Sequence, residues 1–105
     1  MFNFFNMLGN YDNRKVDKYE KDDLLVSTVE CNDGDKAFET AICHPFYNDD
    51  KHVIVEAYNT KQLAQEGHDK WVKVMTTTKP DFLEDCQNAS ISKYMNNIKF
   101  YRKEK

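Results

Sequence analysis

Four strand-like runs follow one another in the first half of this 105-residue chain, at residues 15–20, 24–31, 37–44 and 52–58. Apolar and β-branched side chains tend to recur at every second position, most clearly from Val53 to Tyr58. Short turns rich in Asp and Asn separate the runs, and such turns join neighbouring antiparallel strands. Because consecutive strands with short connections favour a meander, the pattern predicts a four-stranded antiparallel sheet.

A helical period replaces the strand pattern after residue 59. Small and apolar side chains then recur at spacings of three and four residues, which places them on one helix face. They are Ala64, Gly67, His68, Trp71, Val72 and Met75. We therefore predict a long helix over residues 60–75, with Asn59 as its cap and Gln62 completing a capping box.

Two shorter helices are predicted behind the long one. Pro80 suits the first turn of a helix over residues 80–86, and apolar spacing predicts a last helix that ends near Asn97. Strands followed by helices indicate an α+β fold, with the long helix packed on one face of the sheet. In this arrangement Trp71 packs against Val53, Val55 or their neighbours.

The chain has the length of a single domain. We predict an apolar segment and linker over residues 1–13, one α+β domain over residues 14–98, and a solvated basic tail over residues 99–105. The N-terminal apolar run is too short to cross a bilayer and lacks the basic start of a secretion signal. No transmembrane segment is therefore expected.

Charge and cysteine content restrict the setting. The net charge of −3 is too small for a nucleic-acid mimic and has the wrong sign for a general nucleic-acid binder. The three cysteines, Cys31, Cys43 and Cys86, are odd in number and form no CxxC spacing. This pattern predicts free thiols in a reducing compartment rather than a disulfide framework.

Histidine and cysteine are the residue types here that could carry chemistry. A metal site built from Cys31, His44 and His68 requires two strand ends and a helix face to converge, and the spacing leaves that open. Cys43 or Cys31 beside a histidine is the corresponding candidate nucleophile. Because the chain carries no metal-binding signature, phosphate-binding loop or dinucleotide fingerprint, we predict no cofactor and favour a non-catalytic protein.

Several short sequence motifs are distinctive: YEKD at residues 19–22, LLVSTV at 24–29, HPFYN at 44–48, VIVEAYNTK at 53–61 and GHDKWV at 67–72. Through them the chain resembles, over roughly residues 16–72, a group of small uncharacterised proteins encoded by bacteriophages and prophages. The resemblance implies a phage setting in the cytoplasm of a bacterial host, and it implies no particular activity.

Three functional hypotheses follow. The first is a non-catalytic binding protein that acts stoichiometrically on a host or phage macromolecule, as in counter-defence or host takeover. The alternative is a structural or assembly component of the phage particle. The third is a small thiol- or metal-dependent enzyme.

The candidate binding residues are aromatic and imidazole side chains: Phe2, Phe4, Phe5, Phe46, His44, Tyr47, His68 and Trp71. For His68 and Trp71, packing between the helix and the sheet is the competing interpretation. Because one helix covers one sheet face, we also predict a homodimer through the open sheet face or through the N-terminal segment.

Overall fold

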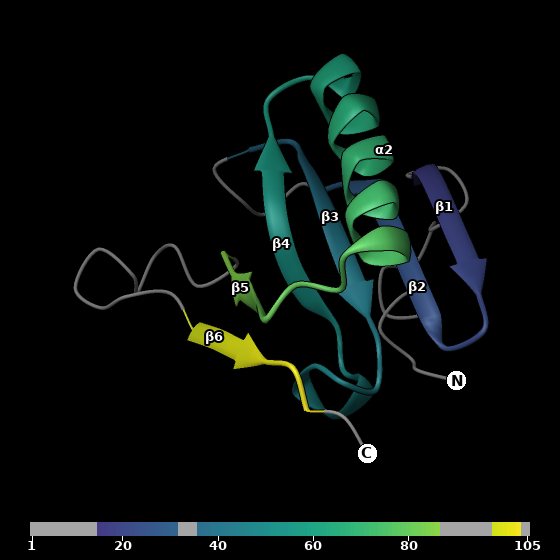
Figure 1. The fold of residues 1–105 in the computed structure, drawn as a ribbon. Coiled ribbons are helices and arrows are strands. Elements are labelled where there is room, and N and C mark those ends of the chain that lie inside the picture. Colours follow the sequence, from purple (N-terminus) through teal and green to yellow (C-terminus); the bar gives the residue numbers. More distant parts are fainter. Residues whose placement is uncertain (1–14, 32–35, 87–97, 104–105) are drawn as a thin grey trace.

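A four-stranded sheet, one long helix and a two-stranded ribbon make up the described part of the chain (Figure 1). The computed structural model describes residues 15–31, 36–86 and 98–103. The elements are β1 (Lys15–Lys21), β2 (Leu24–Glu30), β3 (Phe38–Cys43), the 3₁₀ turn η2 (Asn48–Asp50), β4 (Val53–Tyr58), α2 (Lys61–Thr77), β5 (Phe82–Asp85) and β6 (Ile98–Tyr101). Within the described ranges, no helix has the length and hydropathy needed to span a bilayer.

The predicted α+β fold and its meander are confirmed. Strands β1 to β4 lie in sequence order, and each pairs with the next in antiparallel register. Figure 1 shows α2 lying across one face of this sheet. The partners Tyr19, Val26, Ile42 and Val53 are directly opposite one another across the four strands, so they share that face.

A β-bulge in β4 changes which side chains face the helix. Thr40 pairs with Glu56, while the next residue, Ala41, pairs with Ile54, so Val55 is the extra residue. Simple alternation would place Val53 on the face opposite Glu56 and Tyr58. The bulge instead brings all three to the helix side, and Glu56 becomes part of the helix–sheet interface.

The core lies between α2, the sheet and β5. It comprises the buried residues Leu24, Val26, Ile42, Tyr47, Val53, Met75 and Leu83, with Trp71 and Val55 among the half-buried side chains packed against it. The predicted packing of Trp71 on the helix side of the sheet is therefore confirmed.

Side chains on the second sheet face are also buried within the single chain. They are Leu25, Ser27, Val29, Ala41, Cys43 and Ile54, none of them more than 5% exposed. One of the two surfaces predicted for a homodimer, the sheet face over these strands, is therefore not an exposed apolar patch in the single chain. The homodimer itself stays a prediction, and the other predicted surface, the N-terminal segment, lies outside the described residues.

Helix α2 starts and ends close to the predicted positions. Its N-cap is Thr60 rather than Asn59, because Thr60 is the last residue with extended backbone and its hydroxyl accepts from the Leu63 N–H at 3.1 Å. At the other end, Lys79 adopts a left-handed φ of 49° and donates its N–H to the Val74 carbonyl. This turn stops the helix just before Pro80.

The C-terminal region differs from the sequence prediction. The predicted helix over residues 80–86 is wrong: Phe82–Asp85 is strand β5, which pairs with β6 and buries Leu83 in the core. The expected solvated tail from residue 99 begins instead inside β6, Ile98–Tyr101. The last predicted helix falls on residues 87–97, which lie outside the described part, as does the N-terminal segment 1–13.

Gly67 lets α2 approach the sheet. A Cβ atom at this position would lie far inside contact distance of the Tyr58 ring and hydroxyl. The ring belongs to the last residue of β4 and is itself buried. Glycine is therefore required here by close approach, although it lowers intrinsic helix stability by about 1 kcal/mol relative to alanine.

We expect Gly67→Ala to destabilise the protein by about 1–3 kcal/mol, because the new methyl group overpacks the Tyr58 contact. Helix propensity by itself predicts the opposite sign, a gain of about 1 kcal/mol. Urea unfolding measures the difference, with Glu66→Ala on the exposed side of α2 as the matched control. A stabilised Gly67→Ala variant would contradict the close approach.

Candidate functional site

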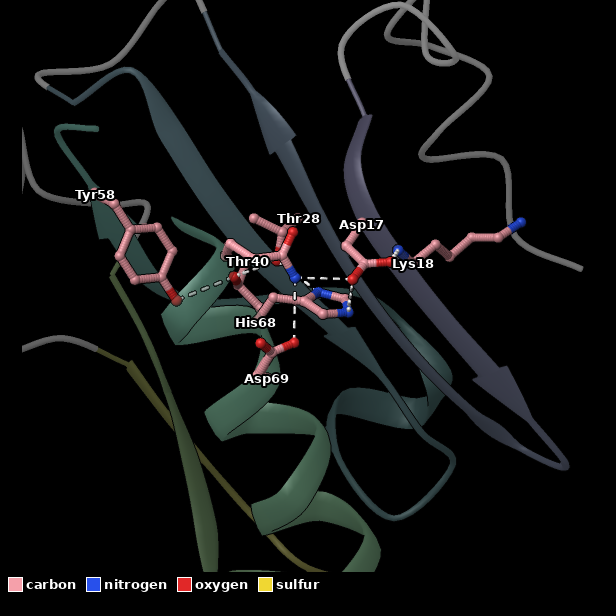
Figure 2. A network of polar contacts seen from close by, with 8 residues as sticks. Asp17, Lys18, Thr28, Thr40, Tyr58, His68 and Asp69 are labelled. Atoms are coloured by element: carbon pink, nitrogen blue, oxygen red, sulfur yellow. Dashed lines mark hydrogen bonds and ion pairs between the residues drawn. The ribbon is translucent and has the colours of Figure 1, made fainter. Parts of the chain in front are cut away.

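A chain of polar side chains crosses the interface between α2 and the sheet (Figure 2). The Asp17 carboxylate lies 3.7 Å from Nε2 of His68, and Nδ1 of His68 lies 2.9 Å from the Thr28 hydroxyl. The Thr28 hydroxyl is 2.6 Å from that of Thr40, which is 3.1 Å from the Tyr58 hydroxyl. We call these five residues, together with Glu56, the polar relay.

Glu56 ends the relay and gathers three donors on one carboxylate oxygen. Its Oε1 accepts from the Tyr58 hydroxyl at 3.1 Å, the Trp71 indole N–H at 2.9 Å and the Lys70 ammonium at 2.6 Å. Burial raises the pKa of Glu56, but these hydrogen bonds outweigh it and hold the pKa below its usual value. Glu56 is therefore ionised at neutral pH.

The ionised carboxylate fixes the direction of every hydrogen bond in the relay. A carboxylate only accepts, and each hydroxyl has one proton to give. Tyr58 therefore donates to Glu56, Thr40 donates to Tyr58, and Thr28 donates to Thr40. The remaining contact, between Thr28 and His68, then requires His68 to donate from Nδ1.

We expect NMR to find the neutral His68 ring protonated on Nδ1. The Tyr58→Phe variant removes the hydroxyl that links Glu56 to Thr40. In this variant, the His68 ring is therefore expected to populate both neutral tautomers rather than the Nδ1-protonated one alone. The nitrogen chemical shifts of the imidazole distinguish the two tautomers. Tyr101→Phe, which removes an exposed hydroxyl elsewhere, serves as the control, and an Nε2-protonated ring in the wild type would contradict the assigned direction.

Burial also controls the protonation of His68. It lowers the pKa of the ring by more than the nearby carboxylates of Asp17 and Asp69 raise it. The pKa of Asp17 is itself lowered, chiefly by a hydrogen bond from Gln65 at 2.9 Å. A buried neutral imidazole binds its proton more readily once the chain unfolds.

The sign of the resulting pH dependence follows from the lowered pKa. The contribution of His68 to the free energy of unfolding is complete above pH of about 6.5, the unfolded pKa, and is lost as the pH falls below it. His44 and His52 also have lowered pKa values, chiefly through burial, and act in the same direction.

When the pH is lowered from about 7.5 to about 5, the free energy of unfolding is expected to fall less in His68→Gln than in the wild type. The reason is that Gln does not titrate in this range. Urea unfolding at both pH values measures the two losses. The variant keeps a smaller pH dependence because His44 and His52 remain. Equal losses in variant and wild type would show that His68 is not held neutral by the fold.

The relay has the order carboxylate, imidazole, hydroxyl, which is also the order of a nucleophilic triad. The hydroxyl in question, on Thr28, is fully buried and already committed to Thr40. A nucleophile must reach a substrate. The relay therefore acts as a structural connection between α2 and the sheet.

The thiols of Cys43 and Cys86 are held in their protonated form. Burial raises the pKa of Cys43 to about 12 and that of Cys86 to about 11, while the Cys31 thiol donates to Glu39 at 3.1 Å. Neither Cys43 nor Cys86 supplies a thiolate at neutral pH. These environments are those of structural cysteines.

The structure does not bring Cys31, His44 and His68 together. His68 contacts Thr28 at the middle of the sheet, while Cys31 follows the end of β2, and His44 follows the opposite end of the sheet, after β3. Strands rise by about 3.3 Å per residue, so His44 lies four residues, or about 13 Å, along β3 from Thr40. Among the described residues, no group of three His, Cys, Asp or Glu side chains could hold a metal ion.

His44, Phe46 and Tyr47 do come together, in the turn after β3. The Phe46 N–H donates to Nδ1 of His44 at 3.1 Å, and the two rings are 4.7 Å apart. The Tyr47 hydroxyl donates to the Pro80 carbonyl at 2.5 Å. Tyr47 is fully buried, so it fixes the turn rather than presenting a binding surface.

A cavity of about 340 Å³ adjoins His44 and Phe46. Its remaining walls come from the β1–β2 turn and the end of α2, and they carry both Asp22 and Asp23 and the opposing charges of Lys21 and Lys79. These charges balance. The cavity therefore favours neither an anionic nor a cationic ligand.

The exposed apolar surface lies elsewhere, on the ribbon formed by β5 and β6. Four large apolar side chains are exposed in the described part of the chain, and three of them are on this ribbon: Phe82, Ile98 and Tyr101, with Leu63 on α2 as the fourth. This surface was not predicted from the sequence. Its signal was the β-forming run at residues 98–101, of which Ile98 was assigned to the domain and residues 99–101 to the basic tail.

The predicted binding residues are therefore divided among several places. His44, Phe46 and Tyr47 share one turn, His68 and Trp71 lie in the helix–sheet interface, and Phe2, Phe4 and Phe5 lie outside the described residues.

Comparison with known proteins identifies no relative. No family model, no curated protein and no solved structure matches this chain.

Proposed function

We propose that this protein is a non-catalytic binding protein that acts stoichiometrically on a macromolecule of a bacterial host or its phage, as in counter-defence or host takeover. The proposal rests on one observation, the pair of exposed aromatic rings on the outer face of the β5–β6 ribbon. Phe82 is 37% exposed and Tyr101 is 59% exposed, and their ring centroids are 5.5 Å apart.

The ribbon face has the composition of a protein-binding surface. Phe82 pairs with Tyr101 and Glu84 with Lys99 across the two strands, so the four side chains share one face. The Lys99 ammonium lies 4.9 Å from the centre of the Phe82 ring. Aromatic residues are enriched at protein interfaces, where a few of them dominate the binding energy.

The interior chemistry supports a non-catalytic role. The buried hydroxyls of Thr28, Thr40 and Tyr58 are committed to one another, and the buried thiols have raised pKa values. Cys31, Cys43 and Cys86 form no disulfide with one another, which suits the reducing bacterial cytoplasm that we propose as the location.

Affinity purification from bacteria, with and without phage infection, tests the proposal. The tagged wild type is expected to retain a protein partner in near-equal amount. The double variant Phe82→Ser/Tyr101→Ser is expected to lose at least about tenfold in affinity, because truncating central aromatic residues typically costs more than 1 kcal/mol each.

Leu63→Ser is the matched control, since it removes an exposed apolar side chain of α2. Loss of the partner in this control as well as in the double variant would contradict a site on the ribbon. Recovery of the protein with sedimenting phage particles would favour the alternative, a structural or assembly component.

A further inference from the structure

The backbone ladder of the ribbon leaves one edge open. The Arg102 N–H donates to the Asp81 carbonyl at 2.8 Å, which fixes the phase of the ladder. Because successive backbone groups point to alternate sides, Phe100 and Arg102 face β5, while Lys99 and Tyr101 direct their N–H and C=O groups away from it.

The next outward position, Lys103, is already paired within the chain. The Lys103 N–H donates to the Phe46 carbonyl at 2.8 Å, so the chain itself pairs with the edge at that point. Within the described ranges, the outward backbone groups of Lys99 and Tyr101 make no corresponding bond. Two consecutive outward positions therefore remain available for strand addition.

A hollow of about 360 Å³ runs beside these two residues. Its lining comes from Lys99, Phe100, Tyr101 and Lys103 on one side, and from Asn48 and Asp49 of the η2 turn on the other. The hollow thus has a strand edge as one wall. Its two ammonium groups outnumber its one carboxylate, so its net charge is positive.

Strand β1, at the outer edge of the four-stranded sheet, differs from β6 in its charge. Strand β1, KVDKYEK, has five charged residues in seven, a pattern that discourages pairing with another chain. Strand β6, IKFY, has one charged residue in four. The contrast marks β6 as the edge at which strand pairing is not opposed.

We propose that β6 is a docking strand, to which an extended acidic segment of the protein partner adds as a further strand. This inference rests on the proposed binding function and specifies its partner. The outward backbone groups of Lys99 and Tyr101 supply the hydrogen bonds, and the ammonium groups of Lys99 and Lys103 select carboxylates.

Selection from a random linear peptide library, with the full chain as bait, tests the chemistry of the partner. Enriched peptides are expected to combine Asp or Glu with β-forming residues and to lack proline at their centre. Lys99→Glu and Lys103→Glu are expected to weaken binding of a selected peptide by about tenfold or more, since like charges oppose association. Lys73→Glu, the same charge change on the exposed side of α2, is expected to leave it unchanged.

Amide hydrogen exchange tests the mode of binding. In the free protein, the amides of Lys99 and Tyr101 are expected to exchange quickly, while those of Phe100 and Arg102 are protected by β5. The selected peptide is expected to protect Lys99 and Tyr101 specifically. A contact made only by side chains would leave this alternation unchanged.

Three results would overturn the inference: no acidic peptide is enriched, the Lys99 and Tyr101 amides exchange alike with and without the peptide, or sedimentation shows self-association through this edge. The last result would make a second copy the occupant. Suppose that one of these results is obtained, but Phe82→Ser/Tyr101→Ser still loses a cellular partner that the wild type retains. The proposed function then stands, while the docking strand is wrong. If no partner binds at all, both fail.

Discussion

The fold depends on how the Glu56 carboxylate is satisfied. This group lies on the helix side of the sheet and takes hydrogen bonds from Trp71 and Lys70 of α2 and from Tyr58 of its own strand. Through Tyr58 it also orders the buried hydroxyls that reach His68. A buried polar group without a partner costs about 1–3 kcal/mol. Tyr58, Thr40, Thr28 and Nδ1 of His68 each have a hydrogen-bond partner in this alignment, so these contacts specify the position of α2 on the sheet more closely than apolar packing does.

The alignment in turn depends on the bulge at Val55. Without the extra residue, Glu56 and Tyr58 would leave the helix side, and the relay would lose its acceptor and its terminal hydroxyl. Gly67 complements this geometry by making room for the Tyr58 ring. One irregularity in a strand and one glycine in a helix are thus parts of the same interface.

The sequence predicts those elements that have a local signal. The four strands and the helix were predictable because alternation and helical spacing are short-range patterns, and the turn around His44, Phe46 and Tyr47 is local too. The ribbon was not, because β5 pairs with a strand more than ten residues away and Pro80 favours a helix start. Nor was the role of Glu56, because residue order does not reveal which position of a strand will bulge.

In the described part of the chain, specific contacts join the ribbon to the rest of the molecule. They include the bond from Cys86 N–H to the Ile54 carbonyl, the bond from Lys103 N–H to the Phe46 carbonyl, and the insertion of Leu83 into the core. An element attached in this way can open as a separate cooperative unit, at a lower free energy than global unfolding.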